Sequence, residues 1–179
     1  MDIKSLTIYC SSSNNLGSEY YKLAENIGVF LANKSIKIIY GGANNGMMGK
    51  VSKAAFDAGG EVIGIMPKFL SKKENISLNV TKNIIVKDMT ERKKKLYQFG
   101  DAFLILPGGS GTIEEATDII SWKFLELHNK KIIIFNFKNY WDSFINIYTD
   151  AKKQNFGNKN LQNICEHVST LKQFKKLFS

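Results

Sequence analysis

Ala102-Phe103-Leu104-Ile105-Leu106-Pro107-Gly108-Gly109-Ser110-Gly111-Thr112-Ile113-Glu114-Glu115 joins an apolar run to a helix-forming stretch through three glycines. The run at 102–106 is continuous and apolar, which is typical of a strand buried on both faces of a parallel sheet. The glycines can adopt backbone angles closed to other residues and let a ligand approach the main chain. The helix that follows presents unpaired N–H groups and a positive dipole end. The stretch therefore predicts an anion site of the kind that binds phosphate.

Thr112 and Glu115 have two interpretations. Thr-x-x-Glu is the spacing of a capping box, in which Thr112 caps the helix and Glu115 folds back onto the N-cap amide. On spacing alone this interpretation is favoured. Helical periodicity, however, places Glu115 on one face with Ile119 and Trp122, while Glu114 points away from that face. On the second interpretation the Glu115 carboxylate faces the mouth of the glycine loop.

The composition is that of an ordinary globular protein, with 44% hydrophobic and 23% charged residues. A length of 179 residues suits one domain, 1–179, that buries a sizeable core. Cys10 and Cys165 are too far apart for a disulfide framework or metal-ligand spacing, which indicates a reducing, cytoplasmic setting. His128 and His167 stand alone, so we expect neither a metal site nor a histidine-based triad.

The net charge of +9 raises the possibility of a DNA-handling protein. The excess is mostly lysine in scattered pairs, and Arg92 is the only arginine. Because proteins that read base edges rely heavily on arginine, nucleic-acid binding is not favoured and solvated helix faces are. The N-terminus lacks the apolar core of a signal peptide, and no apolar run approaches membrane-spanning length. We expect neither secretion nor membrane insertion.

Strand-like runs alternate with helix-like runs along the chain. Strands are expected at 5–10, 36–40, 61–66, 83–86, 102–106 and 131–135. Helices are expected from a Ser18 cap to 33, after the glycine loop to 58, from an Asp88/Glu91 capping box to 99, after 112 and from 140, with an amphipathic tail at 161–178. This alternation predicts an α/β fold, a single Rossmann-like doubly wound parallel sheet with helices on both faces. Ligands bind such sheets at the carboxyl ends of the strands, where the loops at 10–17, 41–49, 88–93 and 107–115 would converge.

Several spaced motifs resemble those of one family. Residues 107–115 match in full the PGGxGTxxE signature of the LONELY GUY (LOG) family, the cytokinin-activating phosphoribohydrolases long mislabelled as lysine decarboxylases. Residues 40–49 resemble the family's YGG…GLMG loop, 63–67 its VIGVIP strand end and 89–93 its MHERK segment. The likeness runs from about 7 to 136 and continues more weakly beyond. Several motifs in the right order are more specific than one glycine loop.

The resemblance implies hydrolysis of the N-glycosidic bond of a nucleoside 5′-monophosphate, with no metal or organic cofactor. Loss of the base builds positive charge on the ribose, which a carboxylate can stabilise. We assign that catalytic role to Glu115 and expect Arg92 to orient the nucleotide opposite it; the alternative for Arg92 is an ion pair with a core carboxylate. Further substrate-binding residues are expected in the loop at Gly108, Gly109, Ser110, Gly111, Thr112, Ile113 and Glu114, and elsewhere at Lys93, Glu74, Ser11, Gly42, Asn44 and Ser121.

Some alternatives stay open on the sequence. The preferred base is not marked by any motif, so AMP or another ordinary nucleotide competes with a cytokinin monophosphate as substrate. The same fold and phosphate loop would also serve a non-catalytic carrier of a nucleotide or phosphoribosyl cofactor. A lysine decarboxylase is not favoured, because no pyridoxal site with a Schiff-base lysine is identifiable. The resemblance implies a homodimer, and Trp122, Phe124 and Leu125 offer either its apolar surface or core packing.

Overall fold

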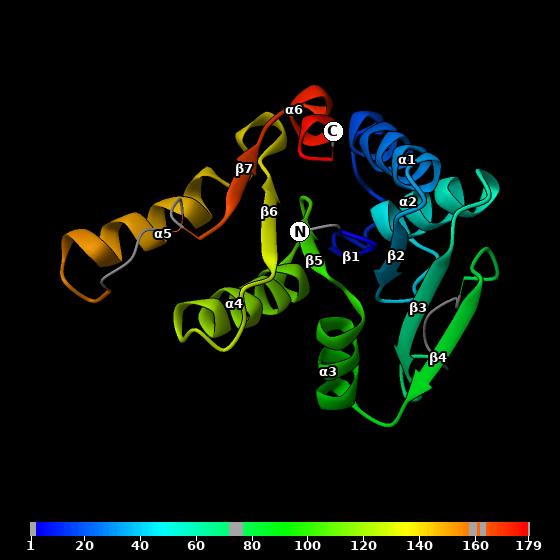
Figure 1. The fold of residues 1–179 in the computed structure, drawn as a ribbon, viewed down its shortest axis with the longest axis horizontal. Helices are drawn as coiled ribbons and strands as arrows, with labels where there is room; N and C mark the ends of the chain where they lie inside the picture. The colour runs from blue at the N-terminus through cyan, green and yellow to red at the C-terminus, as the bar shows by residue number, and fades with distance from the viewer. Residues whose placement is uncertain (1–2, 72–76, 158–160, 162–163, 179) are drawn as a thin grey trace.

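The chain folds around a parallel sheet. The computed structural model describes residues 3–71, 77–157, 161 and 164–178. Within these residues seven strands pair in the order β4-β3-β2-β1-β5-β6-β7, all parallel (Figure 1). The strands are β1 (Ser5–Tyr9), β2 (Lys37–Tyr40), β3 (Val62–Pro67), β4 (Lys82–Val86), β5 (Ala102–Ile105), β6 (Lys131–Phe135) and β7 (Glu166–Val168).

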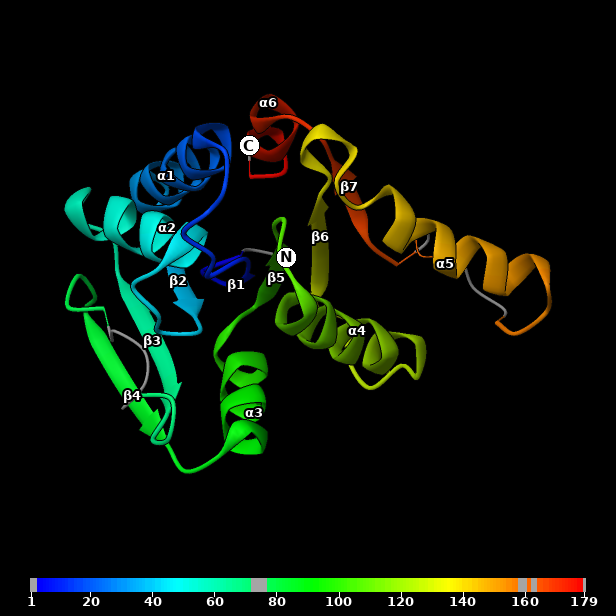
Figure 2. The same ribbon diagram turned by 180° about the vertical axis from the view of Figure 1, so that it is seen from behind.

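Helices cover both faces of this sheet. They are α1 (Ser18–Asn33), α2 (Gly46–Asp57), α3 (Met89–Phe99), α4 (Ser110–Phe124), α5 (Asp142–Lys153) and α6 (Leu171–Lys176), with a short 3-10 helix at Phe137–Asn139. One hydrophobic cluster joins the sheet to α1, α2 and α6, and a second joins it to α3, α4 and α5. Figures 1 and 2 show α1, α2 and α6 on one side of the strands and α3 and α4 on the other. The predicted doubly wound fold is confirmed.

The direction of winding reverses at β1. The chain runs outward from β1 through β2 and β3 to β4, then returns to place β5 on the opposite side of β1. Such a reversal opens a crevice at the carboxyl ends of the two central strands. Backbone hydrogen bonds hold the loops there: Ser11 N–H donates to Pro107 O (3.1 Å) and Met48 N–H donates to Ser11 O (3.2 Å). The three loops that follow β1, β2 and β5 are therefore fixed against one another.

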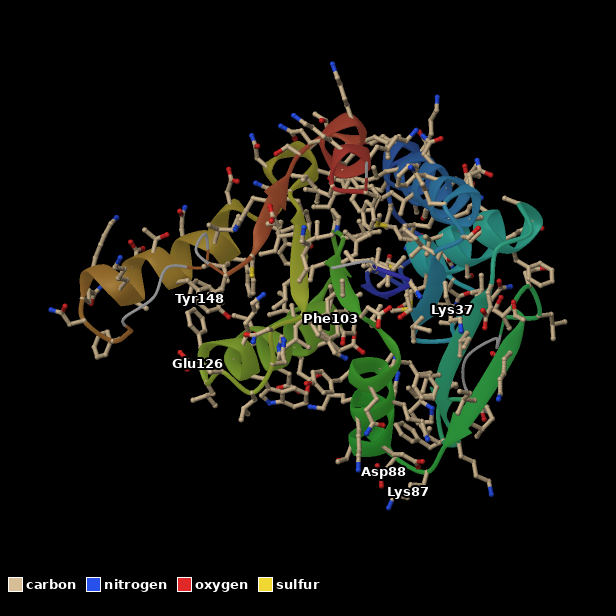
Figure 3. All side chains as sticks on the ribbon, viewed as in Figure 1. Lys37, Lys87, Asp88, Phe103, Glu126 and Tyr148 are labelled. Carbon is tan, nitrogen blue, oxygen red and sulfur yellow. The ribbon has the colours of Figure 1, made fainter. Side chains whose placement is uncertain are left out.

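The helix starts differ in part from those predicted. The residue before α1 is Gly17, and no side chain caps that helix, so the predicted Ser18 cap is wrong. At α3, Asp88 accepts from the Glu91 amide as predicted, but the Glu91 carboxylate reaches the amide of Lys87. Figure 3 labels Lys87 and Asp88 at this helix start. The Glu91 side chain thus reaches the residue before the N-cap and not the N-cap amide that a capping box requires.

The capping box predicted at Thr112 and Glu115 does not form. Helix α4 begins at Ser110 after the N-cap Gly109, and its N-terminus has no side-chain cap. Thr112 is therefore already inside the first turn, and the Glu115 side chain is free of a capping role. The glycine loop continues directly into helical geometry, which the Thr-x-x-Glu spacing could not reveal.

The segment at 161–178 contains a strand that the sequence analysis missed. Three residues, β7, pair with β6, with His167 opposite Ile134. The helix α6 that follows begins with a capping box formed by Thr170 and Gln173. Its Phe174 ring packs edge-on against Phe30 of α1, at 5.8 Å between centroids. The tail thus packs on the body of the domain. No described helix is long and apolar enough to cross a membrane.

Candidate active site

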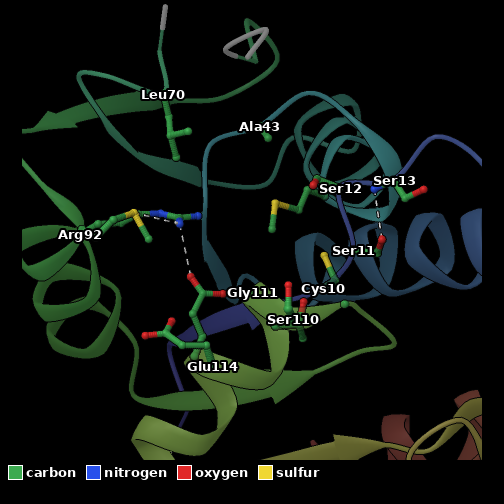
Figure 4. Close-up of a pocket in the computed structure, with 15 residues that line it drawn as sticks. Cys10, Ser11, Ser12, Ser13, Ala43, Leu70, Arg92, Ser110, Gly111 and Glu114 are labelled. Carbon is green, nitrogen blue, oxygen red and sulfur yellow. Dashed lines mark hydrogen bonds and ion pairs between the residues drawn. The ribbon is translucent and has the colours of Figure 1, made fainter. Parts of the chain in front are cut away.

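A cavity of about 410 Å³ opens at the carboxyl ends of β1 and β5 (Figure 4). The loop after β1, the glycine loop after β5 and the first turns of α2, α3 and α4 surround it. Its described lining consists of Cys10, Ser11, Ser12, Ser13, Ala43, Met48, Leu70, Met89, Arg92, Gly109, Ser110, Gly111, Thr112, Glu114 and Glu115. The cavity therefore lies where a doubly wound sheet is expected to bind a ligand.

Arg92 and Glu115 face each other across this cavity. Nη1 of Arg92 lies 3.5 Å from Oε1 of Glu115, as the dashed line in Figure 4 shows. Both side chains are buried, with 9% of Arg92 and 6% of Glu115 exposed. The guanidinium also donates to the carbonyls of Ile65 (3.3 Å) and Gly41 (3.5 Å). A Cβ at Gly41 would collide with Nη2 of Arg92, so the glycine there makes room for the cation.

The Glu115 carboxyl group has an unusual acidity. Burial raises its pKa from 4.5 to about 7, although the nearby Arg92 cation acts in the opposite direction. The Glu114 carboxylate raises it further, while Lys93 lowers it. Oε1 of Glu115 accepts no hydrogen bond from any described residue. Since unsatisfied buried oxygens are rare in folded proteins, this one is available to a ligand.

The glycine loop presents open backbone to the cavity. A Cβ built on Gly109 or Gly111 would meet nothing within 4 Å. Gly108, by contrast, lies against the Thr112 side chain, with no room for a Cβ. The Tyr140 hydroxyl, which is not part of the described cavity lining, donates to Gly108 O at 2.8 Å. The loop is thus fixed on its protein side and open on its cavity side, next to the free N–H groups of α4.

The structure brings most of the predicted residues together. Ser11, Arg92, Gly109, Ser110, Gly111, Thr112, Glu114 and Glu115 line the cavity. Gly42 lies buried against β3, and Asn44 is exposed outside the described lining. Ile113 and Ser121 are exposed on α4 and also lie outside that lining, as does Gly108. Glu74 falls outside the described residues. Lys93 is paired with Glu114 and Asp118 beside the cavity.

Sequence reasoning missed an apolar wall of the cavity, formed by Met48, Leu70 and Met89. The methionines begin α2 and α3, directly within the motifs already noted, so their position was a usable signal. Leu70 gave none. Cys10 also lines the cavity, but burial raises the pKa of its thiol well above the usual value, so it is a poor nucleophile.

Two chemistries find little support in this lining. None of the described lining residues is a lysine, so the part of the cavity that the structure describes offers no Schiff-base nitrogen. Across the described residues, no group of three or more histidine, cysteine, aspartate or glutamate side chains could hold a metal ion. The chemical equipment of the cavity is therefore an arginine, two glutamates, hydroxyl groups and backbone amides.

The sequence matches a family profile and is similar to several named enzymes. A family profile described as "Possible lysine decarboxylase" matches residues 48–177. A cytokinin riboside 5′-monophosphate phosphoribohydrolase of Rhodococcoides fascians is 36% identical over 154 residues, covering 86% of this chain and 78% of that protein. The chain belongs to the LOG family. A LOG protein of Arabidopsis thaliana with the same enzyme name is 34% identical over 171 residues, covering 96% of this chain and 80% of the relative.

Solved structures extend the fold comparison beyond the LOG enzymes. The molybdenum cofactor carrier protein of Chlamydomonas reinhardtii superposes with a TM-score of 0.72 at 16% identity, covering 97% of this chain and 94% of that one. A molybdenum cofactor binding protein of Rippkaea orientalis gives 0.71 at 20% identity, covering 100% and 99%. At these identities the likeness concerns the fold alone.

Proposed function

We propose that this LOG-family chain hydrolyses the N-glycosidic bond of nucleoside 5′-monophosphates, releasing a free base and ribose 5-phosphate. One observation carries the proposal: the buried Glu115 carboxyl, with its pKa near 7, faces Arg92 inside the cavity. The open start of α4, the helix that bears Glu115, lines the same cavity. Relatives at 34–36% identity carry the name of this activity. Cytokinin riboside monophosphates and AMP are the substrates that we would test first.

The 5′-phosphate binds at the start of α4. Gly109, Ser110, Gly111 and Thr112 line the cavity there, and they supply backbone amides and two hydroxyl groups. Helix N-termini attract anions through their free N–H groups and positive dipole ends. Helices α2 and α3 also begin at this cavity, through Met48 and Met89. The amides of Met48 and Glu91 are already bonded to Ser11 O and to the Asp88 carboxylate, so the start of α4 is the one of the three that is open to a phosphate.

Glu115 acts on the ribose. When the bond between C1′ and the base nitrogen breaks, its electron pair leaves with the base and positive charge builds on the sugar. An ionised Glu115 stabilises that charge and takes a proton from the water that attacks C1′. The hydroxide adds to C1′, and the proton that Glu115 has taken passes through solvent to the departing base, so Glu115 is ionised again. Arg92, held by the carbonyls of Ile65 and Gly41, orients the nucleotide against Glu115.

The test is release of ribose 5-phosphate from a panel of nucleoside 5′-monophosphates that includes an N6-isopentenyl-adenosine monophosphate. We expect the wild type to turn over at least one of them and Glu115→Gln to lose about 10²–10³-fold in kcat. Calorimetry of the variant should still show nucleotide binding. Binding without turnover by the wild type would contradict the proposal and favour the non-catalytic carrier, which the same fold could serve.

We also propose that the chain forms a homodimer through the end of α4. Trp122 packs edge-on against Tyr97 at 5.1 Å, and Phe124 stacks on Tyr148 of α5. Both are therefore engaged within the subunit. Leu125 and Leu127, which are 69% and 66% exposed, remain as apolar surface for a partner. The free cysteines Cys10 and Cys165 suit a reducing, cytoplasmic location.

A further inference from the structure

Lys93 makes a second pair of ionic contacts beside Arg92 and Glu115. Its ammonium lies 2.6 Å from Oε1 of Glu114 and 2.7 Å from Oδ2 of Asp118. Two consecutive residues of α3 thus pair with three acidic residues of α4. Figure 4 shows Arg92 reaching from α3 toward α4, where Glu114 is also labelled.

The Lys93 ammonium is not placed to contact a nucleotide. It does not line the large cavity; it lines a separate space of about 10 Å³, together with Tyr9, Tyr97, Glu115, Asp118, Ile119 and Trp122. A space of that size has room for roughly one water molecule. The hydrogen-bonded carboxylates of Asp118 and Glu114 raise the pKa of Lys93, so the ammonium stays charged between them. A substrate phosphate would have to compete with both of them.

Side chains make the connection between α3 and α4. Tyr97 and Trp122 meet edge-on further along the helices, at 5.1 Å between ring centroids. At the cavity end the connection consists of Arg92 with Glu115 and Lys93 with Glu114 and Asp118. Arg92 belongs to α3 and Glu115 to α4. Contacts that hold α3 against α4 therefore also set the distance between the side chains of Arg92 and Glu115.

We infer that Lys93 is a positioning residue: held between Glu114 and Asp118, it clamps α3 to α4 and sets the spacing and charge balance of the Arg92–Glu115 pair. This inference rests on the proposed function, because it assigns Lys93 a role in the reaction at Glu115. It replaces the direct substrate contact that the family resemblance implied for Lys93. Glu114 then has two roles: it lines the cavity, and its carboxylate holds the Lys93 ammonium.

The clamp has an electrostatic consequence at Glu115. The charged groups that act on this carboxyl are Arg92 and Lys93 from α3 and Glu114 and Asp118 from α4. From the end of β1 it is faced by Tyr9 and Cys10, whose pKa values are raised so that both stay neutral. Without Lys93, the carboxylates of Glu114 and Asp118 would be uncompensated. The pKa of Glu115 would rise, and less of it would be ionised at neutral pH.

The test compares Lys93→Met with Lys93→Arg and with the control Lys94→Met, an exposed neighbour on the same helix. For Lys93→Met we expect kcat to fall roughly tenfold to a hundredfold, because small misplacements of a catalytic pair are costly. The KM for the nucleotide should stay nearly unchanged. In an NMR titration of the Glu115 carboxyl, assigned with Glu115→Gln, the pKa should move upward. Lys93→Arg should keep most of the activity, and Lys94→Met all of it.

Asp118→Asn separates a clamp from a substrate contact. If Lys93 is a clamp, this variant loses part of kcat, and the double variant Lys93→Met/Asp118→Asn recovers part of the Glu115 pKa shift because one uncompensated charge is gone. If Lys93 contacts substrate, Asp118→Asn frees the ammonium and lowers KM, and Lys93→Met raises KM with the Glu115 titration unmoved; that result would overturn the inference. Should the wild type release no ribose 5-phosphate, the proposed function fails, while the Glu115 titration still decides whether Lys93 controls this carboxyl.

Discussion

The guanidinium of Arg92 lies 3.5 Å from the Glu115 carboxylate, yet the facing oxygen accepts no hydrogen bond from any described residue. An arginine this close usually lowers the pKa of a carboxyl group. Here burial outweighs the cation and raises the Glu115 pKa to about 7. Arg92 has the carbonyls of Ile65 and Gly41 as acceptors, whereas Oε1 of Glu115 has the ion pair without a hydrogen bond. Such a pair is poised for a ligand that inserts its own polar groups.

This acidity predicts a pH dependence of catalysis. If the ionised Glu115 is the working form, kcat/KM should rise with pH and level off above about 7, because the group loses its proton in that range. We would measure ribose 5-phosphate release between pH 5 and 9. A profile that is already level at pH 5 would show that Glu115 is not the group that limits the reaction.

Arg92→Ala should shift the same profile to higher pH. The Arg92 cation lowers the Glu115 pKa more than Lys93 does, so its removal leaves burial opposed by Lys93 alone and makes the carboxyl harder to ionise. The variant should also bind nucleotide more weakly by calorimetry, because the cation that faces the cavity is gone. Unchanged affinity would place Arg92 in a purely structural ion pair, the alternative that the sequence left open.

The same burial predicts a cost in stability. The folded-state pKa of Glu115 is raised, so the folded protein holds this proton more tightly than the unfolded chain. The group therefore stabilises the fold least once both states are ionised, above about pH 7. Glu115→Gln, which mimics the protonated form, should gain about 2 to 3 kcal/mol relative to wild type between pH 5 and pH 8. Urea unfolding at the two pH values measures the difference.

Glu114→Gln is the matched control for that experiment. It stands next to Glu115 on α4, but its side chain is half exposed, so solvent screens its charge. It removes only the contribution of Glu114 to the Glu115 pKa shift, so its effect on unfolding should depend on pH much less than that of Glu115→Gln. An equal pH dependence in both variants would mean that burial of Glu115 is not the source of the effect.

The fold was largely predictable because its signals are local. Continuous apolar runs at 102–106 and 132–135, each followed by a helical pattern, are enough to indicate a parallel α/β sheet. The inward position of Arg92 followed from helix periodicity and is confirmed. β7 was missed because a three-residue strand on the sheet edge carries too little pattern to read. Its pairing is decided by β6, far away in the sequence.

The site was less predictable where its geometry depends on tertiary contacts. The Thr-x-x-Glu spacing fits both a capping box and an inward carboxylate, and only the start of α4 at Ser110 separates them. The contact of Tyr140 with Gly108 joins residues 32 apart and leaves no pattern in the sequence. Leu70 enters the cavity wall from a loop without any motif. Ser121 lies on the α4 surface, outside the described lining, despite its family position.

Dimer formation can be tested at the exposed end of α4. Leu125→Asp places a charge in the proposed interface and should shift sedimentation toward monomer, because burying an unpaired charge is costly. Leu78→Asp, at a residue that is 88% exposed in a loop outside α4, is the control and should leave sedimentation unchanged. If Leu125→Asp sediments like the wild type, the apolar surface at 125 and 127 is not the interface.

Two glycines of the same loop should respond in opposite ways to substitution by alanine. Gly111→Ala adds a methyl group into open space at the start of α4, where alanine favours the helix, so the variant should unfold at the same temperature as the wild type or slightly above it. The methyl would occupy the space next to the α4 amides, so nucleotide and inorganic phosphate should both bind more weakly. Gly108→Ala collides with the Thr112 side chain and should lower stability by roughly 1–3 kcal/mol, as expected for overpacking.

Comparing the two variants separates a loop that binds phosphate from one that only packs. We would measure phosphate affinity by calorimetry, and the temperature of thermal unfolding, for Gly111→Ala and for Gly108→Ala. If Gly111→Ala binds phosphate as the wild type does, the open side of the loop is not the anion site, and the phosphate must lie nearer to Ser11–Ser13. If Gly111→Ala instead unfolds at lower temperature, its backbone is under a constraint that the open space around it does not explain, and the weaker binding would then follow from a disturbed helix start.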